Sequence, residues 1–286
     1  MPINYTDLKN RRFEDVRQRY SARDTILYAL GIGMGADPQD QHQLRYVFDS
    51  ELRAMPTMAV VLGSPGFWMQ LPETGLDWKN ILHLDQELTL HQSLPASGEV
   101  VGKTTVEALV DKRASGAVLY TRCDVFDVAT SALLATTRSG NLCRSDGHFE
   151  GGDTIDWTVH KLPNSPPDLQ CDLPSTAQAA LIYHLSGDDN PLHVDITYAR
   201  QAGFERPMLH GLGTFGMAGH AALRTLCAYD PARLKKLRVR FSAPFYPGET
   251  LRTTFWTYGN GTAGFQCHSV QRGVMVINNG FVEYMQ

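Results

Sequence analysis

The sequence predicts an α+β protein of two similar halves, each an antiparallel sheet wrapped around a central helix. Runs of alternating apolar residues, typical of strands, fill the later part of each half, and one apolar helix-like stretch precedes each set of runs. An offset near 150 residues also aligns Tyr28–Gly31 with Tyr183–Ser186. We therefore predict an N-terminal unit at 1–150, and a connector followed by a C-terminal unit at 151–286.

The elements are expected in the same order in both halves. The first half should hold a helix at 58–69, and the second half a helix at 213–227. Apolar side chains surround most of the second stretch, which is typical of a buried helix. Gly, Pro and Asp are frequent at 145–175, so this segment is expected to be a connector. Each helix is followed by four strands that we expect to form an antiparallel meander. The expected strands are 81–94, 99–111, 117–128 and 132–142 in the first half, and 234–245, 250–258, 264–271 and 274–284 in the second.

The composition excludes several classes of protein. The chain of 286 residues has a net charge of −4 and a pI near 6.2, which argues against a nucleic-acid partner. Its five cysteines include no Cys-x-x-Cys pair, so neither a disulfide framework nor a zinc–thiolate site is indicated, and we expect a cytoplasmic protein. The N-terminus shows no apolar signal region, and no apolar run approaches the roughly 20 residues of a membrane span.

The turn-rich segment Tyr183–His193 carries the residues best suited to acid–base chemistry. Asp188 and His193 are five positions apart, roughly 140° around a regular helix, so a turn must bring them together. Asn190 followed by Pro191 supplies that turn. A carboxylate and an imidazole across a rigid turn suggest a general acid–base pair. The alternative is a capped turn, in which Asp188 and Asn190 only accept hydrogen bonds from the local backbone.

A second candidate element is the segment His210–Gly213, directly before the predicted buried helix. The first N–H groups of a helix lack intrahelical partners and lie at the positive end of its dipole, so they could bind an oxyanion. Gly211 would let a substrate carbonyl approach the backbone closely. Close packing of the helix against the sheet is the alternative, and it explains Gly216 and Gly219 better than Gly211.

Other chemistries fit the sequence less well. The segment Gly211–Gly216 matches Gly-x-Gly-x-x-Gly, but a dinucleotide site needs a preceding buried strand, and 200–210 is polar. No Gly-x-Ser-x-Gly segment indicates a serine hydrolase. We expect no metal site, because the available ligands lack the usual spacing. The residues considered for a metal are His184, His193, Asp195 and His210.

A row of cationic residues follows in the second half. Alternation along the expected strand places Lys236, Arg238 and Arg240 on one face. Such a row is typically the solvated face of a half-buried strand. The alternative is a phosphate site, as coenzyme A would require.

The segment Tyr183–His193 resembles the signature of MaoC-like, (R)-specific enoyl-CoA hydratases of the hydratase 2 type, and 207–216 is similar to the second conserved block of that family. The resemblance implies a double hot dog fold, in which antiparallel strands wrap a long central helix and only the C-terminal half is catalytic. Through the two-repeat layout it extends over nearly the whole chain. One position departs from the family pattern, since Ile196 stands where proline is frequent.

The resemblance also implies a reaction: hydration of a trans-2-enoyl-CoA to an (R)-3-hydroxyacyl-CoA and the reverse dehydration, with no cofactor besides the coenzyme A of the substrate. Asp188 and His193 would hold and activate the water. Asn190 would orient this pair, and the Gly211 N–H would bind the thioester oxygen. The further residues expected to contact the substrate are His210, Gly213, Arg238 and Arg240.

The first half has no equivalent of Asp188 and His193 at the aligned positions, and we expect it to accept the acyl chain. Adaptable apolar residues suit that purpose, although they equally suit a core. These residues are Met55, Met58, Phe67, Trp68 and Met69. An exposed sheet edge in each half favours a homodimer. Alternative functions are a hydratase for a branched, dicarboxylic or sterol-derived acyl-CoA, a nicotinamide oxidoreductase, and a non-catalytic acyl-CoA binding protein, which would not need both Asp188 and His193.

Overall fold

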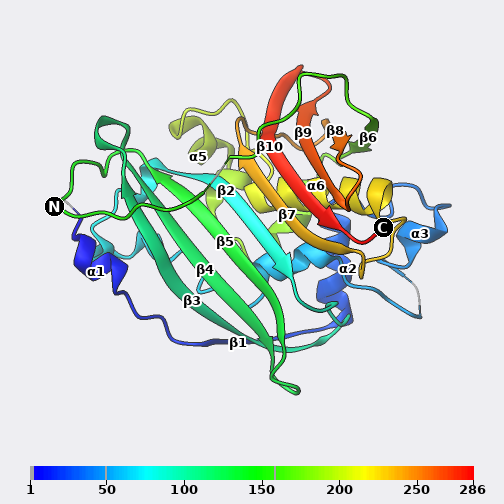
Figure 1. Cartoon of the computed structure of the whole chain (residues 1–286), viewed down its shortest axis with the longest axis horizontal. Helices are drawn as coiled ribbons and strands as arrows, with labels where there is room; N and C mark the ends of the chain where they lie inside the picture. Colours follow the sequence, from blue (N-terminus) through cyan, green and yellow to red (C-terminus); the bar gives the residue numbers. More distant parts are fainter. Residues whose placement is uncertain (1–2, 49, 158) are drawn as a thin grey trace.

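Ten strands form a single antiparallel sheet in the computed structural model, which describes residues 3–48, 50–157 and 159–286. Their order is β1-β3-β4-β5-β2-β7-β10-β9-β8-β6. The first five strands of the chain therefore occupy one end of the sheet and the last five the other, as the colours of Figure 1 show. Each strand has its counterpart at the same distance from the centre, so β2 and β7 meet at an approximate two-fold axis.

Both halves follow the same order: an edge strand, a helix, a helical stretch beneath the sheet, and four long strands. The elements of the first half are α1 (Tyr5–Lys9), β1 (Val16–Tyr20), α2 (Ala22–Gly31), α3 (Gln41–Leu44), η1 (Pro56–Val61), η2 (Trp68–Gln70), η3 (Pro72–Thr74), η4 (Trp78–Asn80), β2 (Ile81–Leu90), β3 (Gly98–Asp111), η5 (Arg113–Ser115), β4 (Ala117–Asp127) and β5 (Leu133–Cys143). Those of the second half are β6 (Leu169–Pro174), α4 (Ala179–His184), η6 (Pro191–His193), α5 (Ile196–Gln201), α6 (Gly211–Leu226), β7 (Leu234–Phe241), β8 (Thr250–Thr257), β9 (Thr262–Ser269) and β10 (Val274–Tyr284).

All eight strands predicted from the sequence are present, within a few residues of their expected bounds. Their predicted order as two meanders is wrong, because β2 pairs with β5 and β7 in the sheet and is separated from β3 by two strands. Alternation of apolar residues predicts which segments extend and which face they bury. Which strand pairs with which depends instead on where the longer connections cross the sheet. The local sequence pattern contains no information about these crossings.

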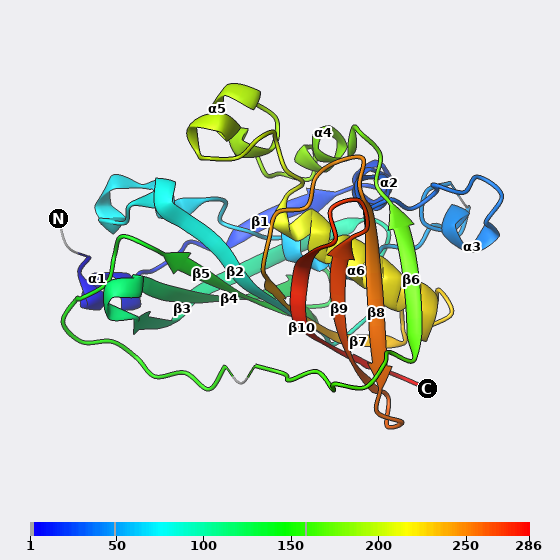
Figure 2. The ribbon, with the colours of Figure 1, turned by 90° about the horizontal axis from the view of Figure 1, so that it is seen from above.

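The segment 145–175 is only partly a connector, because its last residues form the edge strand β6. This strand pairs with β8, is short and ends at Pro174, so its alternation is too brief to detect. Figure 2 shows the preceding stretch running along the outer side of the sheet, away from α4 and α5. There the ring of Trp157 lies 4.9 Å from that of Tyr120. Position 158 of the predicted connector lies outside the described residues.

The two predicted helices have different outcomes. The buried helix expected at 213–227 is confirmed as α6, and most of its residues are fully buried. The helix expected at 58–69 is wrong. That region forms the short 3₁₀ helices η1 and η2, separated by a loop in which Gly63 and Gly66 have φ angles of 63° and 71°. A regular helix cannot continue through left-handed residues. The first half consequently has no long helix of its own.

One long helix therefore serves both halves. α6 packs against η1 and β2 of the first half and against β7 and β8 of the second. A single hydrophobic core includes Tyr28 and Leu88 from the first half with Phe215, Leu237 and Phe255 from the second. The ten-stranded antiparallel sheet packed on α6 is the expected double hot dog, with the 3₁₀ helices of the first half in the place where the second half has its long helix. Within the described residues, no helix combines the length and the apolar character that a bilayer crossing demands.

The sheet edges expected to be exposed in each half pair with one another. β2 and β7 are joined from Asp85 opposite Arg240 to Thr89 opposite Lys236. Among the described strands the edges of the combined sheet are β1 and β6, both of them short. The homodimer stays a prediction, and it would use other surfaces than β2 or β7.

Candidate active site

The loop after α4 positions the three polar residues singled out in the sequence. Gly187, with a φ of 103°, ends the turn that follows the helix. Asp188 Oδ1 then accepts the N–H of Asn190 at 3.1 Å, and Asn190 Oδ1 accepts the N–H of Leu192 at 3.1 Å. The capped turn proposed as the alternative thus exists. Only Oδ1 of Asp188 takes part in that turn. The turn therefore orients the carboxylate, and Oδ2 remains available to a ligand.

His193 is held in a single tautomer. Its side chain is 8% exposed, and its Nδ1–H donates to the carbonyl oxygen of Met208 at 3.0 Å. A carbonyl oxygen can only accept, so Nε2 of the neutral ring carries the lone pair. Burial lowers the pKa of His193, and the nearby Asp188 carboxylate opposes that effect. At neutral pH the ring therefore offers a proton acceptor beside a carboxylate.

His210, predicted to contact the substrate, packs instead against the ring of His193. The two ring centroids are 3.9 Å apart, and His210 is fully buried. Its Nε2–H donates to the backbone oxygen of Asp188 at 3.4 Å. Burial, followed by the neighbouring His193, lowers the pKa of His210 to about 2, so the ring stays neutral. His210 contacts the ring of His193 and the backbone of Asp188, and its side chain is not accessible to a ligand.

The N-terminus of α6 faces the same place. Gly211 is the first residue of this 16-residue helix, and its N–H is among those that a helix leaves without an intrahelical partner. A Cβ atom at this position would lie 3.4 Å from Nδ1 of His83 and 3.7 Å from the ring of Phe241. Glycine therefore keeps open a narrow gap between the helix and the two central strands.

Gly213, another expected substrate contact, has a packing role. A Cβ atom there would lie 3.2 Å from Leu209 and 3.3 Å from Tyr183. Both neighbours belong to the main core. The residue is buried on the side of α6 that packs against α4, and the structure does not bring it to the gap beside Gly211.

His83 is a site residue that sequence reasoning missed. A β-bulge in β2 between His83 and Asp85 shifts the alternation, so that His83 and Gln86 face the interior together. The Nε2–H of His83 donates to the backbone oxygen of Asp85 at 3.0 Å, which leaves Nδ1 toward Gly211. Burial lowers the pKa of His83, while Asp85 and Asp188 act to raise it. A histidine inside an apolar strand pattern was the only available signal.

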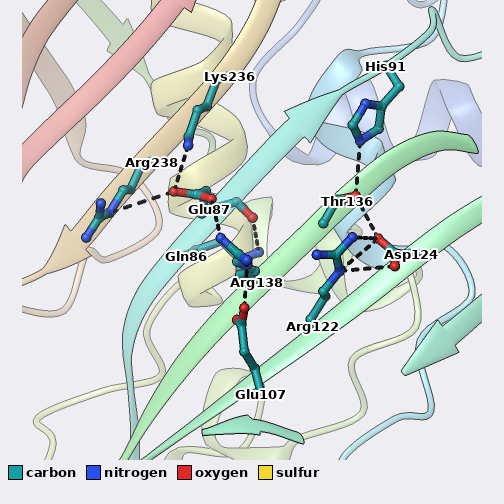
Figure 3. A network of polar contacts seen from close by, with 10 residues as sticks. All are labelled: Gln86, Glu87, His91, Glu107, Arg122, Asp124, Thr136, Arg138, Lys236 and Arg238. Carbon is teal, nitrogen blue, oxygen red and sulfur yellow. Dashed lines mark hydrogen bonds and ion pairs between the residues drawn. The ribbon is translucent and has the colours of Figure 1, made fainter. Parts of the chain in front are cut away.

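Arg238 and Arg240 lie on the outer face of the sheet, opposite the face that packs on α6. Arg240 makes two hydrogen bonds to the Asp85 carboxylate, at 2.9 and 3.0 Å. The guanidinium of Arg238 lies 4.4 Å above the ring of Trp157 and 4.0 Å from Glu87. Figure 3 shows Glu87 surrounded by cations from both halves. The structure thus does not bring the two arginines to Asp188, and their charges are matched by carboxylates.

A metal site was disfavoured from spacing, yet three possible ligands do converge. Donor atoms of Asp188, His193 and His210 all lie within 4.8 Å of one another. Asp195, considered earlier, caps α5 by accepting the N–H groups of Thr197 and Tyr198. Nδ1 of His193 and Nε2 of His210 are already donors to carbonyl oxygens. The arrangement suits a bound water as well as a cation, and the acid–base pairing is the simpler use of it.

A cavity of about 150 Å³ lies in the first half, next to His83. Its walls come from the segment 60–69, from the inner faces of β2 to β5, and from Leu212 of α6. His83 also lines it, so the cavity reaches the gap at Gly211. Three components therefore meet: a carboxylate–imidazole pair, a helix N-terminus, and a pocket large enough for part of a ligand.

The apolar residues expected to hold an acyl chain divide between pocket and core. Trp68 and Met69 line the cavity, and both are also buried in a hydrophobic core. Met55 and Met58 belong to the main core, and Phe67 packs at the edge of a second, smaller core. For these last three the core alternative is the one that the structure favours.

Comparison with known proteins covers both halves. A model of the MaoC-like domain matches residues 158–280, and a model of the MFE-2 hydratase 2 N-terminal domain matches residues 18–145. The chain is 35% identical to peroxisomal multifunctional enzyme type 2 of Mus musculus over 92% of its own length and 36% of the mouse protein. It thus spans about a third of that relative.

Two further relatives match from end to end. The chain is 34% identical to 3-hydroxyacyl-thioester dehydratase Y of Mycobacterium tuberculosis, over 93% of each chain. A crystal structure of a MaoC-like dehydratase from Phytophthora capsici superposes with a TM-score of 0.87 at 31% identity, over 99% of each chain. The likeness therefore includes the ten-stranded sheet and both halves of the molecule.

Proposed function

The chain belongs to the MaoC-like family of hydratase 2 proteins, and from that membership we propose that it hydrates trans-2-enoyl-CoA thioesters to (R)-3-hydroxyacyl-CoA, reversibly. The observation that supports this most directly is the convergence of Asp188 and His193 near His83, a residue that faces Gly211 and lines a cavity. An acyl-CoA binding protein would need the cavity but not the acid–base pair.

The reaction requires a polarised water and a donor at the thioester oxygen. A water between the Asp188 carboxylate and Nε2 of His193 loses a proton to this pair as its hydroxyl bonds to C3. The electrons of the C2–C3 double bond move toward the thioester, whose oxygen becomes an enolate oxygen. The Gly211 N–H stabilises this oxygen, a contribution of about 3 kcal/mol in comparable sites. The pair then returns a proton to C2, and no proton is gained or lost in the cycle.

The remaining residues position this machinery. Asn190 fixes the turn that presents Asp188 and His193. His210 supports the ring of His193 from behind and stays neutral, so it adds no charge that would repel a proton from His193. His83 brings a second imidazole from the first half to the entrance of the cavity.

We propose that the acyl chain binds in the first half, and the position of the cavity supports this. With the thioester oxygen at Gly211, the chain beyond C3 passes His83 and enters the space beneath the segment 60–69. We further propose a cytoplasmic homodimer, to be checked by light scattering of the purified protein and by cell fractionation.

The test of the function is the absorbance of the enoyl-thioester band after mixing protein with crotonyl-CoA. We expect the band to disappear with the wild-type protein and to persist with Asp188→Asn, whose side chain has the same size but no charge. Chiral analysis of the product should give the (R) isomer. Equal turnover by Asp188→Asn would overturn the site, and no turnover of any enoyl-CoA by the wild type would overturn the function.

A further inference from the structure

The inner wall of the cavity is polar where a pocket for an alkyl chain should be apolar. Inward positions of β4 run from Leu119 through Thr121 and Cys123 to Val125, so Thr121 is a polar residue among apolar neighbours on this strand. The facing positions on β5 are equally polar. We call the group on β3, β4 and β5 the polar band; it consists of Thr104, Thr121, Thr137, Ser139 and Asn141.

The band keeps hydrogen-bonding capacity that its own members do not use. Thr121 and Ser139 share one hydrogen bond of 2.7 Å between their hydroxyls. Asn141, which is 8% exposed, reaches Ser139 at 3.4 Å with its amide nitrogen. The Thr104 hydroxyl is buried and interacts with the Cys123 thiol, so the free capacity of the band lies with Thr121, Ser139 and Asn141. Polar atoms left unpaired against an alkyl chain would cost binding free energy.

The roof over the band is apolar except for Ser64. Val60, Leu62, Trp68 and Met69 cover the cavity from the side of the 3₁₀ helices. The backbone of the roof contacts β3 directly at Gly63. A Cβ atom at Gly102 on β3 would lie only 2.0 Å from the carbonyl oxygen of Gly63, so this contact requires glycine at 102. The pocket is therefore a slot with one apolar and one polar wall. Its volume is close to that of a cavity that holds a benzene-sized group.

The slot offers no fixed charge to a ligand. Its titratable lining residues are His83 and Cys123, and burial lowers the pKa of the first and raises that of the second, so both stay neutral. The charged residues of the same strands point outward, as Figure 3 shows for Arg122, Asp124 and Arg138. A terminal carboxylate would find no countercharge here, whereas a hydroxyl or carbonyl would find both donors and acceptors.

We propose that the preferred substrate is a 2-enoyl-CoA whose acyl chain carries an uncharged hydrogen-bonding oxygen, a hydroxyl or a carbonyl, bound by the polar band. The proposal rests on the hydratase function and narrows it to oxygenated acyl groups. It identifies Thr121, Ser139 and Asn141 as specificity residues, since they line the slot and share one network.

The first experiment compares substrates of one chain length on the wild-type protein. The set is a plain medium-chain trans-2-enoyl-CoA, the same chain with a hydroxyl on its penultimate carbon, and the same chain with a terminal carboxylate. We expect kcat/KM for the hydroxylated chain to exceed that for the plain chain by about tenfold or more, since a site built for a hydroxyl disfavours the analogue without it. A plain or carboxylated chain that is turned over equally well or better would overturn the proposal.

The second experiment removes the band without changing its shape much. The double variant Thr121→Val with Ser139→Ala deletes both partners of the 2.7 Å hydrogen bond and removes the 3.4 Å contact of Asn141 with Ser139. We expect the ratio of kcat/KM for hydroxylated and plain chains to fall toward one. The matched control is Thr105→Val, which changes an exposed threonine on the outer side of β3 and should keep the wild-type ratio. Circular dichroism verifies folding, and the substrate comparison above decides the matter if the double variant does not fold.

Crotonyl-CoA separates failure of this proposal from failure of the function, because it is too short to reach the band. Hydration of crotonyl-CoA without preference for the hydroxylated chain would leave the hydratase function standing and overturn the oxygenated substrate. Absence of turnover for crotonyl-CoA and for all three medium chains would overturn both.

Discussion

His193 owes its proposed role as proton acceptor to the hydrogen bond between its Nδ1 and the carbonyl oxygen of Met208. The substitution His193→Gln keeps a side chain that can donate to this oxygen, but it removes the basic nitrogen. We expect kcat for crotonyl-CoA to fall by a factor on the order of 10² to 10⁴, the usual contribution of an acid–base group. Thermal unfolding checks that the protein stays folded. Turnover near that of the wild type would remove His193 from the mechanism.

The pH dependence of kcat/KM follows from the same residue. Burial lowers the pKa of His193 from its ordinary value of 6.5, so in the folded protein the ring is neutral at about pH 7. The fraction able to take a proton falls only when the pH drops through that lowered pKa. We expect the rate to be flat near neutrality and to decline on the acid side, with a midpoint below 6.5. An acid limb centred above 6.5 would be incompatible with a buried neutral imidazole.

Gly211 can be tested separately from the acid–base pair. The substitution Gly211→Ala places a methyl group 3.4 Å from Nδ1 of His83, in the gap where the thioester oxygen is proposed to bind. The φ angle at Gly211 is not in the left-handed region, so alanine causes no backbone strain. We expect kcat/KM to fall at least tenfold while the free energy of unfolding changes little. A loss of stability with normal turnover would assign Gly211 to packing instead.

The residues of the site differ in how far the sequence could reveal them. Asp188, Asn190 and His193 share one short turn, and Gly211 opens a helix whose burial is visible in its composition, so local patterns were enough. His83 comes from the other half of the chain, and a bulge decides which way it points. Neither the long-range contact nor the bulge leaves a trace in the spacing of apolar residues.

α6 and η1 cross at close range. A Cβ at Gly219 would fall 2.4 Å from Cγ2 of Thr57, too close for any side chain without movement. We expect Gly219→Ala to reduce the free energy of unfolding by about 1–3 kcal/mol, the usual cost of overpacking a core. Urea unfolding measures the change. Gly211→Ala is the matched control, because it makes the same change in the same helix without the clash. Equal stabilities of the two variants would contradict the close crossing.

Long elements with a clear apolar periodicity were predictable from the sequence. Short edge strands and 3₁₀ helices were not. The eight long strands and α6 follow from alternation and from apolar content. The helix expected at 58–69 failed because the apolar content that suggested it serves a roof of short 3₁₀ helices, interrupted at Gly63 and Gly66. β1 and β6 are short edge strands, and five or six residues carry too little pattern.

At the scale of the whole molecule, the halves are joined by charge as well as by the sheet. Asp85 on β2 has a side chain only 2% exposed, and it makes a bidentate pair with Arg240 on β7. We expect Asp85→Ala to destabilise the protein by about 2 kcal/mol. This is below the usual cost of breaking a buried pair, because Arg240 remains one-third exposed. Chemical denaturation, followed by circular dichroism and by tryptophan fluorescence, gives the change and shows whether both halves unfold together.

The control for that experiment is Asp172→Ala. Asp172 makes the same bidentate contact with Arg252, but both side chains are well exposed, at 37% and 40%. Exposed pairs contribute less than about 1 kcal/mol. A loss as large as that of Asp85→Ala would show that burial at the seam is not the cause.

The pairing of β2 with β7 makes the site independent of dilution. His83 and the cavity come from one half, and Asp188, His193 and Gly211 come from the other, so in an assembly of two separate chains the site would open once the concentration fell below the dissociation constant. Here the partner strand is tethered covalently, and its effective concentration is set by the length of the connector. Specific activity should therefore remain constant down to nanomolar protein. The activity per molecule in a cell should not depend on how many copies are present.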